Sequence, residues 1–517
     1  MPAPQLRLAE LMASFSLAID LGSGQPMEWV IRCTLLGARL AEALNLNEDE
    51  RRDIFYLSLL RHIGCTANAH SDAQLFGNEM VGAAAMTIDA DDTQAVIRYV
   101  TSVIGKDTLG NNRPWLARAA MFARVLAAGP NLAKANHTAQ CEVGQHLAAA
   151  LGFEPRLQQA LLHVYERWDG KGDVTQLKGQ QIPLAVRVTH VAQDAAAFFQ
   201  LGGLDMAVEI ARNRAGRQFD PDIVETFCKH ASALCSGLDA PSSWEAVLAA
   251  EPGAPLILTD EQLDSAAYAI ADFTDLKSPF MLSHSRHVAG LAEAAARRCR
   301  LPDTDVAAIR RAGLIHDIGR VGVTSGIWGK AGPLTEAEWE RVRLHSYYTE
   351  RIFTRAASLA PLSALAAQHH ERLDGSGYHR RLPGASLTLM ARLLAAADVY
   401  SAMTEPRPHR AALPPERAAD ELRRAVKAGK FDSQAVDEVL SAAGHTVGKR
   451  HGMATSLSER EIEVLRLLAR GSTNKQIAHE LFITEKTVEH HVTHIYNKIG
   501  VSSRAAATLH AMQNGLL

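Results

Sequence analysis

The 517-residue sequence lacks several features that would place a protein at once. No apolar run approaches the roughly 20 residues of a membrane helix, and the N-terminus has no basic-then-apolar signal pattern. Only six cysteines occur and none forms a CxxC pair, which favours free thiols in a reducing compartment over disulfides or a zinc site. A net charge of −3 gives no general attraction for nucleic acid. We therefore expect a cytoplasmic protein without a membrane partner, in which any DNA contact is local.

Alternation of apolar and polar residues, the pattern of half-buried strands, is also almost absent. Ala- and Leu-rich segments with apolar residues three and four positions apart fill most of the chain, which predicts an all-α fold. With 47% hydrophobic residues, the chain can bury the cores of about three domains. Linker composition near 238–256 and 441–456 divides it into blocks at 1–240, 257–440 and 456–517.

The first two blocks share an ordered series of motifs. HHERLDGSGYHRRLPG (369–384) matches VYERWDGKGDVTQLKG (164–179) at an offset of 205 residues. HDIGR (316–320) matches RHIGC (61–65) at an offset of 255, so the first copy holds about 50 more residues between these motifs. GKFDSQAV near the end of the second block similarly echoes RQFDPDIV in the first. The series predicts two tandem domains of one fold.

The second block carries histidines and aspartates in separate helical contexts. His316 and Asp317 end an apolar helical pattern, and Asp398 follows nine mostly apolar residues. A carboxylate carried into a helical core needs a paired charge or a metal. A single histidine on an apolar face is ordinarily a core residue, but four imidazole-bearing segments with two such carboxylates favour a metal site. The candidate ligands are His284, His316, Asp317, His345, His369, His370 and Asp398.

Together, HDIGR, HSYYTERIF, HHERLDGSGYH and ARLLAAADVYSAMTEPRPHR resemble the HD-GYP subfamily of HD-domain phosphohydrolases, over about residues 270–440. The resemblance implies a helical bundle that binds divalent metals and hydrolyses a cyclic dinucleotide, usually c-di-GMP. Asp317 is implied as the bridging carboxylate, and His284 occupies the family's early histidine position. Phe280 stands where members with three metals have glutamate, so we expect two ions. The implied ligands are His316, Asp317, His345, His369, His370 and Asp398.

The resemblance also implies the chemistry. Two cations about 3.5–4 Å apart activate a shared water and stabilise charge on the attacked phosphate. Mixed imidazole and carboxylate ligands suit iron, manganese, nickel or zinc. Asp317 and Arg320 are the implied catalytic residues, although Arg320 replaces the family's usual lysine. The family's GYP motif reads GYH in this sequence, and its RPYR motif reads RPHR. These departures leave the substrate open. The implied substrate-binding residues are Arg320, Gly377, Tyr378, Arg407 and Arg410.

The repeat transfers each ligand position to the first block. There the residues are Trp29, Arg61, His62, Gln140, Val164, Tyr165 and Gln193, and none keeps the ligand type of its counterpart. An arginine and a large aromatic ring at these positions would fill the cavity and repel cations. We therefore interpret 1–240 as a degenerate HD-like domain without metal, acting as a sensor or a dimerisation scaffold.

The third block has the sequence outline of a helix-turn-helix. Helical apolar spacing stops at Gly471, and a short helix, NKQIAHELF, follows. Thr484 can cap a third helix over 485–498 by accepting from the N–H of Lys486 or Thr487. A helix, a tight turn and a longer capped helix are the elements that place a recognition helix in the major groove.

LSERE, LARG, TNKQIA and KTVE in this order resemble the LuxR-type DNA-binding domain, a four-helix unit here. The resemblance implies double-stranded DNA as a partner, with Val488, Ile495 and Ile499 in the core. Seven Lys/Arg against six Asp/Glu over 456–517 predict weak binding by a monomer, so we expect a homodimer, through 503–513 or the N-terminal blocks. The implied DNA contacts are Lys475, Thr484, Lys486, Thr487, Glu489, His490, Thr493 and Lys498.

Two hypotheses of different class remain. In the first, the chain is a transcription regulator whose second block hydrolyses a cyclic dinucleotide or a related phosphoester. In the second, that block only senses a nucleotide and controls DNA binding. The complete ligand set favours retained chemistry, whereas Arg320, His379 and His409 favour a changed substrate or slow turnover.

Overall fold

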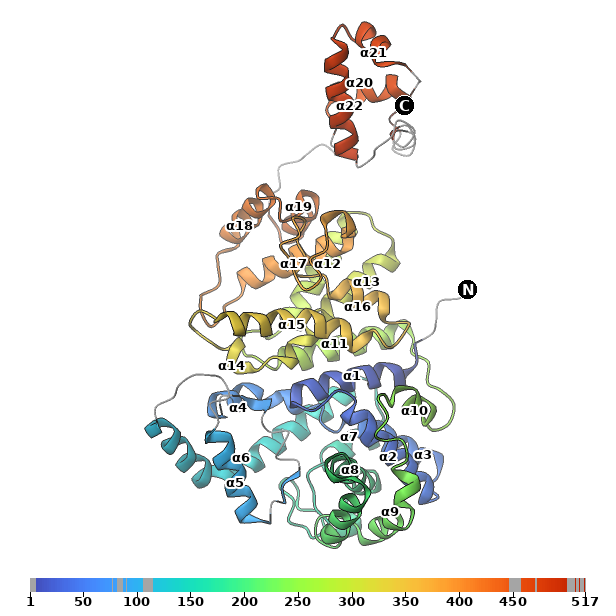
Figure 1. Ribbon diagram of the computed structural model, residues 1–517, viewed down its shortest axis with the longest axis vertical. Coiled ribbons are helices and arrows are strands. Elements are labelled where there is room, and N and C mark those ends of the chain that lie inside the picture. Colours follow the sequence, from blue (N-terminus) through green and yellow to red (C-terminus); the bar gives the residue numbers. More distant parts are fainter. Residues whose placement is uncertain are drawn as a thin grey trace. The chain divides into compact units, whose positions relative to one another are not determined.

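The computed structural model describes residues 6–76, 78–80, 87–89, 91–105, 115–445, 457–469, 472–499, 507, 511 and 516. Over these residues the chain forms helices and no β-strand, which confirms the all-α prediction (Figure 1). Met1–His445 and Thr446–Leu517 are separate compact units. No described helix is long and apolar enough to cross a membrane. All six cysteines are unpaired.

The first unit contains one series of helices twice. The first copy also has an additional helix, α5 (Thr93–Gly105), in the longer connection that the sequence indicates. Its other elements are α1 (Leu8–Ser23), α2 (Trp29–Ala43), α3 (Glu48–Leu60), η1 (Cys65–Asn68), α4 (Ala69–Phe76), α6 (Trp115–Ala150), α7 (Pro155–Leu161), η3 (Gly179–Gln181), α8 (Leu184–Arg214) and α9 (Pro221–Leu234). The second copy consists of α11 (Asp260–Asp275), α12 (His284–Arg298), α13 (Asp303–Ile315), η4 (Ile318–Gly322), α14 (Ser325–Trp328), α15 (Glu336–Phe353), α16 (Ala360–Ala366), η5 (Gly384–Ser386), α17 (Leu389–Thr404), α18 (Pro415–Lys427) and α19 (Ser433–Ala442).

Unusual backbone conformations recur at the offsets found in the sequence. Left-handed residues stand in pairs 255 or 205 positions apart: Glu28 and Ser283, Asn45 and Arg300, Gly170 and Gly375, Gln176 and Arg381. Such conformations are uncommon for residues other than glycine, so their coincidence identifies equivalent turns. The two copies therefore share a backbone as well as a motif series.

A buried aspartate begins the same helix in each copy. Asp20 accepts from the backbone N–H of Trp29 and Val30, both at 3.1 Å. Asp275 accepts from the backbone N–H and hydroxyl of Ser285, at 3.0 and 2.8 Å. A carboxylate stabilises the otherwise unsatisfied N–H groups of a helix N-terminus. In the second copy this contact fixes the start of α12, where His284 lies.

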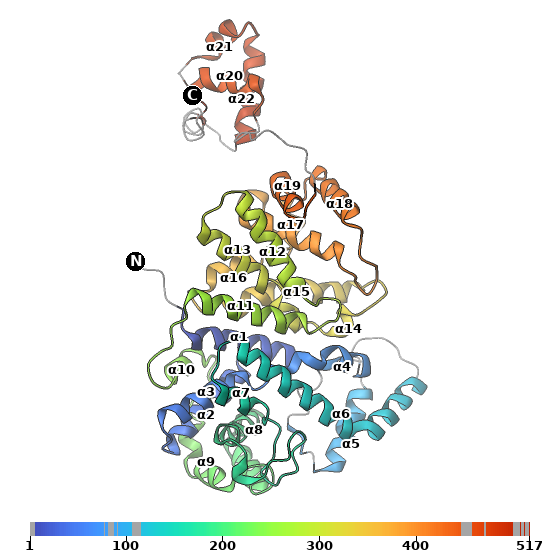
Figure 2. The ribbon, with the colours of Figure 1, turned by 180° about the vertical axis from the view of Figure 1, so that it is seen from behind.

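The copies pack against one another through equivalent elements. Helix α1 contacts α15, its counterpart α11 contacts α6, and α4 contacts its own counterpart α14. Figures 1 and 2 show α1 and α11 side by side between the two copies. Phe15 packs edge-to-face on Phe273 there, with ring centroids 4.8 Å apart. Each contact thus recurs with the roles of the two copies reversed. The interface between the copies therefore resembles the isologous interface of a homodimer, although it lies within one chain.

The segment predicted to link the first two blocks is packed instead. Residues 238–256 contain α10 (Trp244–Ala249), which contacts α2 and buries Trp244 and Val247. The chain then returns to the N-terminus, where Leu8 N–H donates to Leu256 O at 2.7 Å. Linker composition misled because the stretch carries Pro241, Pro252 and Pro255, whereas its burial comes from contacts with distant elements. In the second predicted linker, residues 446–456 lie outside the described residues.

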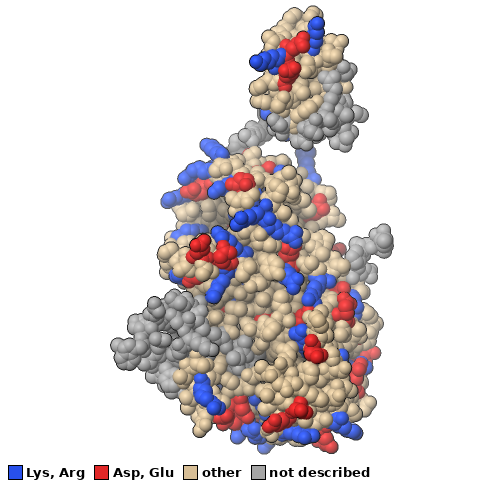
Figure 3. Space-filling view, in the orientation of Figure 1, with Lys and Arg blue, Asp and Glu red and all other residues tan. Residues whose placement is uncertain are grey.

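Positive and negative side chains are mixed on the surface of the first unit, as the nearly balanced composition leads one to expect. Figure 3 shows lysine and arginine interspersed with aspartate and glutamate on the visible face, with no broad patch of one sign among the coloured residues. This face therefore offers no extended electrostatic surface for nucleic acid.

The second unit has the predicted helix-turn-helix elements. They are α20 (Glu459–Ala469), α21 (Asn474–Glu480) and α22 (Glu485–Ile499). Thr487 N–H donates to Thr484 Oγ1 at 3.2 Å, which confirms the predicted cap. Val488 and Ile495 are buried and Ile499 packs against the same core, as predicted. Most of 503–513, one of the two predicted dimerisation regions, lies outside the described residues.

Candidate metal centre

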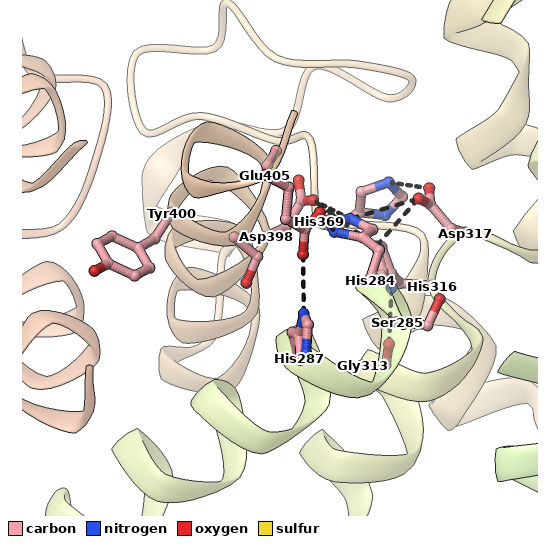
Figure 4. A network of polar contacts seen from close by, with 12 residues as sticks. His284, Ser285, His287, Gly313, His316, Asp317, His369, Asp398, Tyr400 and Glu405 are labelled. Atoms are coloured by element: carbon pink, nitrogen blue, oxygen red, sulfur yellow. Dashed lines mark hydrogen bonds and ion pairs between the residues drawn. The ribbon is translucent and has the colours of Figure 1, made fainter. Parts of the chain in front are cut away.

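The predicted ligands come from five places along the second copy. They stand at the start of α12 (His284), at the junction of α13 and η4 (His316 and Asp317), within α15 (His345), after α16 (His369 and His370) and within α17 (Asp398). All are buried except His370, whose side chain is 20% exposed. Figure 4 shows the side chains of His284, His316, Asp317, His369 and Asp398 drawn together. The structure brings the whole predicted set to one point.

The Asp317 carboxylate lies between two groups of histidines. Its Oδ1 is 3.5 Å from His345 Nε2 and 3.6 Å from His369 Nε2. Its Oδ2 is 3.5 Å from His316 Nε2 and 3.8 Å from His284 Nε2. Asp398 faces the second group, with Oδ1 3.4 Å from His284 Nε2. Ligand atoms of three groups converge to within 4.8 Å: His345, His369 and His370; His284, His316 and Asp398; His316, Asp317 and His369.

Backbone carbonyls orient three of the imidazoles in the same way. The Nδ1–H of His316, His345 and His369 donates to the carbonyl three residues earlier, on Gly313, Val342 and Ala366. That bond leaves Nε2 as the unprotonated nitrogen, directed at the centre. Each imidazole is therefore held in the tautomer that a metal ligand requires.

Burial keeps two of these imidazoles neutral. It lowers the pKa of His345 to about 4 and that of His369 to about 3. Burial alone would raise the pKa of Asp317, but Arg320 and the surrounding histidines hold it well below its usual range. His284 differs, because Asp398 and Glu405 outweigh the effect of burial and raise its pKa to about 9. A metal bound at His284 would displace that proton.

The donor atoms fit a divalent cation. His316 Nε2 and Asp317 Oδ1 are buried and have no hydrogen-bond partner among the described residues. His345 Nε2 and His369 Nε2 lie 3.0 Å apart, although the donated Nδ1–H leaves both nitrogens with a lone pair. Buried groups of this kind are costly unless something satisfies them. A cation satisfies all four atoms.

Glu405 is an outer residue of the site that the sequence did not indicate. Its Oε2 lies 2.8 Å from His284 Nδ1, and its Oε1 lies 3.1 Å from His287 Nδ1 (Figure 4). A carboxylate behind a ligating histidine fixes the ring and raises its basicity. Glu405 follows α17 directly, in the TEPRPHR stretch. In that stretch the sequence predicts functional roles only for the two arginines.

Arg320 and Tyr378, two of the predicted substrate-binding residues, border the centre. Arg320 Nη1 donates to Asp317 Oδ2 at 3.0 Å, and its guanidinium stacks 3.7 Å from the centroid of Trp328. The ring of Tyr378 lies 4.6 Å from that of His370. The residue before Tyr378 is Gly377. A side chain there would clash with the backbone, because its Cβ would lie 2.5 Å from Glu371 Cα.

The guanidinium groups of the two arginines in the RPHR motif donate hydrogen bonds to other groups of the same chain. Arg407 donates to the carbonyl of Phe280 at 2.7 Å and to Glu405 at 3.1 Å. Arg410 donates to the carbonyls of Met403 at 3.0 Å and of Glu405 at 3.2 Å, and to that of Ala402. Cations at the end of α17 stabilise the last helical carbonyls. In this structure their guanidinium groups brace the end of the helix that carries Asp398.

The equivalent positions of the first copy bond to one another. His62 Nε2 lies 2.9 Å from Gln193 Oε1, and Tyr165 donates to Gln140 at 2.5 Å. Arg61 donates to the Val164 carbonyl at 3.1 Å. Burial, with the charge of Arg61, lowers the pKa of His62 to about 3. All three ligand clusters found among the described residues lie in the second copy.

Two glycines confirm this equivalence. A Cβ on Gly64 would lie 2.0 Å from the carbonyl oxygen of Gln140, and one on Gly319 would lie 1.9 Å from that of His345. Only glycine allows so close an approach of the following helix. Gln140 and His345 therefore hold the same place in the two copies.

Most of the predicted DNA contacts are exposed in the second unit. Lys475 of α21 is exposed, as are the residues of α22 and its cap that were predicted to contact DNA. Lys498 differs, because its ammonium pairs with the buried Glu461 carboxylate at 2.7 Å. The exposed set on and before α22 is Thr484, Lys486, Thr487, Glu489, His490 and Thr493.

Each of the two units matches a known protein family. Residues 269–435 match the HD domain family, and residues 455–511 match the bacterial regulatory proteins of the luxR family. The 3'3'-cGAMP-specific phosphodiesterase 3 of Vibrio cholerae is 34% identical over 416 residues, covering 80% of this chain and 89% of that protein. The chain belongs to the HD-GYP family of phosphodiesterases.

The HD-GYP relationship extends beyond the copy that carries the candidate ligands. A crystal structure of a cyclic GMP-AMP specific phosphodiesterase from V. cholerae superposes with a TM-score of 0.58 at 29% identity, covering 86% of this chain and 99% of that one. The transcriptional regulatory protein LiaR of Bacillus subtilis is 44% identical over 100 residues, 19% of this chain and 47% of LiaR. This HD-GYP protein therefore joins a phosphodiesterase domain to a LuxR-type DNA-binding domain.

Proposed function

We propose that this protein is a transcription regulator whose second copy hydrolyses a phosphodiester bond of a cyclic dinucleotide. The observation that carries the proposal is the convergence of five histidines and two carboxylates, with His316 Nε2 and Asp317 Oδ1 lacking a hydrogen bond from any described residue. Relatives named as 3'3'-cGAMP-specific and cyclic di-GMP phosphodiesterases support this substrate class. Because the longest of these matches is to a 3'3'-cGAMP-specific enzyme, that dinucleotide is the first to test.

Two divalent ions fit the arrangement of donors. The two oxygens of Asp317 face different histidine groups, and Asp398 reaches both His284 and His370. Iron, manganese, nickel and zinc all accept such mixed ligands. A bound metal pair supplies an activated water and charge stabilisation for the phosphate. The ligands are His284, His316, Asp317, His345, His369, His370 and Asp398.

Other residues of the site bind and orient the substrate. The Arg320 guanidinium borders the centre and would donate to a phosphate oxygen, since an arginine fork matches that geometry. Trp328 holds the guanidinium plane from one side. Tyr378, packed against His370, offers an aromatic face beside the ligands for a nucleotide base.

A hydrolysis assay tests the phosphodiesterase. The full chain, loaded with manganese or iron, is incubated with 3'3'-cGAMP and with c-di-GMP, and linear products are separated by chromatography. We expect turnover that Asp317→Ala abolishes. Binding of the dinucleotide without hydrolysis, at full metal content, would favour the alternative, a regulator that only senses the nucleotide.

The second unit supplies the output. We infer that α22 enters the major groove of double-stranded DNA, with Lys486, Thr487 and Glu489 near base edges and Lys475 on phosphate. A homodimer would present two such helices to two half-sites. Because the two copies already pair within one chain, the dimer contact would use other surfaces.

A further inference from the structure

One carboxylate of the first copy is buried in the second. Glu79 follows α4, and its side chain is 6% exposed. Its Oε1 pairs with Lys277 Nζ at 2.9 Å and accepts from the Ser325 N–H at 2.8 Å. Its Oε2 accepts from the Thr324 hydroxyl at 2.7 Å. The contact therefore crosses from the copy without ligands to the copy with them.

These partners control the segment that follows the HD motif. Lys277 Nζ donates to the Val321 carbonyl at 2.8 Å, and the Ser325 hydroxyl donates to the Lys277 carbonyl at 3.2 Å. Thr324 in turn caps α14 by accepting from the Gly326 N–H. Glu79 thus holds this segment at both ends, from Val321 to the first turn of α14.

The far end of α14 reaches Arg320. Trp328 Nε1 donates to the Arg320 carbonyl at 3.3 Å, and the Trp328 ring lies beneath the guanidinium. Arg320 therefore rests on a short helix whose opposite end is fixed by Glu79. Movement of α14 by even a fraction of an ångström would move the guanidinium relative to Asp317.

The ion pair is buried, with both side chains at most 6% exposed, and one-sided. Burial alone raises the pKa of Glu79, but Lys277 and the hydrogen bonds from Ser325 and Thr324 lower it below its usual value. At the 255-residue offset, Lys277 corresponds to Gly22, so the first copy has no cation at the equivalent place. Among the described residues, this ion pair therefore runs in one direction, toward the copy with the candidate ligands.

We propose that Glu79 is a positioning residue for the second copy, which fixes the Val321–Trp328 segment and thereby places the Arg320 guanidinium at the edge of the metal centre. The proposal rests on the proposed function for the substrate that Arg320 meets. It gives the first copy a part in the site although that copy has no ligands of its own.

Hydrogen exchange on the metal-loaded full chain tests the link without substrate. Glu79→Gln should speed amide exchange over 318–328 about tenfold, because a charge-assisted acceptor is lost. Thr324→Val keeps the ion pair and should give a smaller increase in the same segment. The matched control is Arg355→Gln, which removes a different ion pair between the copies, with Glu28, and should leave 318–328 unchanged. Unchanged exchange in both test variants would overturn the proposal.

A double-mutant cycle then tests whether Glu79 acts through Arg320. Glu79→Gln should lower kcat about tenfold at unchanged metal content, yet cause no further loss in an Arg320→Ala background. An equal loss in both backgrounds would mean that Glu79 only supports the fold, and would overturn the positioning role. If the wild type hydrolyses no cyclic dinucleotide, the proposed function fails, while the exchange result still decides the link from Glu79 to the segment.

Discussion

The two copies of the first unit share a scaffold and differ in chemistry. Asp20 and Asp275 begin equivalent helices, and Glu166 and Glu371 accept hydrogen bonds from equivalent loops. At the ligand positions, by contrast, the second copy directs lone pairs at one point and the first pairs its side chains with each other. The comparison shows that the fold does not depend on metal ligands. What the fold needs lies in helix starts and loops, and what the metal needs lies in side chains that face the centre.

The largest expected effect separates the two copies outright. Asp317→Ala removes the carboxylate that faces both histidine groups, so bound metal should fall to near zero. His62→Ala, at the equivalent position, should leave metal content unchanged. Elemental analysis of the purified variants measures both. An equal loss from the two substitutions would show that the first copy also holds metal.

Next in size is a change in catalysis without a change in metal. Arg320→Ala should reduce turnover on the order of 10²-fold, because a charge-assisted contact to the phosphate is lost in the transition state. Metal content should stay at the wild-type value, since Arg320 contacts the Asp317 carboxylate rather than an ion. Steady-state kinetics with parallel metal analysis gives both numbers. Loss of metal together with activity would make Arg320 a support of the ligand set instead.

A smaller effect is expected where the DNA-binding unit is compared with the whole chain. Lys486→Ala should weaken DNA binding by roughly 1–3 kcal/mol, in a fragment from residue 452 and in the full chain alike. The full chain should bind more tightly if it dimerises, because the second half-site is then met at high effective concentration. Titrations at one salt concentration compare the four proteins. Equal affinity of fragment and full chain would remove the first unit from any dimer on DNA.

The smallest effect should be alike in the two copies. Glu371 accepts from the backbone N–H of Arg380, Arg381 and Leu382, and Glu166 from the N–H and hydroxyl of Thr175. Glu371→Gln and Glu166→Gln should each cost about 1 kcal/mol in the free energy of unfolding, because the amide oxygen still accepts part of these bonds. Denaturant unfolding measures the cost. A loss from only one substitution would mean that the shared loop supports one copy alone.

Sequence patterns predicted the parts of this protein that depend on neighbours along the chain. Helical spacing, the Thr484 cap and the motif offsets concern residues a few positions apart, or a pattern that repeats intact. They were sufficient for the all-α fold, the repeat and the helix-turn-helix. The packing of 238–256 could not be predicted in this way, because its burial depends on α2 and the N-terminus rather than on its own composition.

The sequence by itself determined which side chains have the chemistry of metal ligands and which copy lacks them at the equivalent positions, since ligand chemistry belongs to the side chain. Tertiary structure decided what those residues meet. Glu405 reaches His284 across 121 positions, and Glu79 reaches Ser325 across 246. Arg407 and Arg410, predicted to bind substrate, are held by carbonyls that only packing brings near. Such contacts have no local pattern, because a buried charge is stabilised by whatever the folded chain places within a few ångströms, regardless of distance along the sequence.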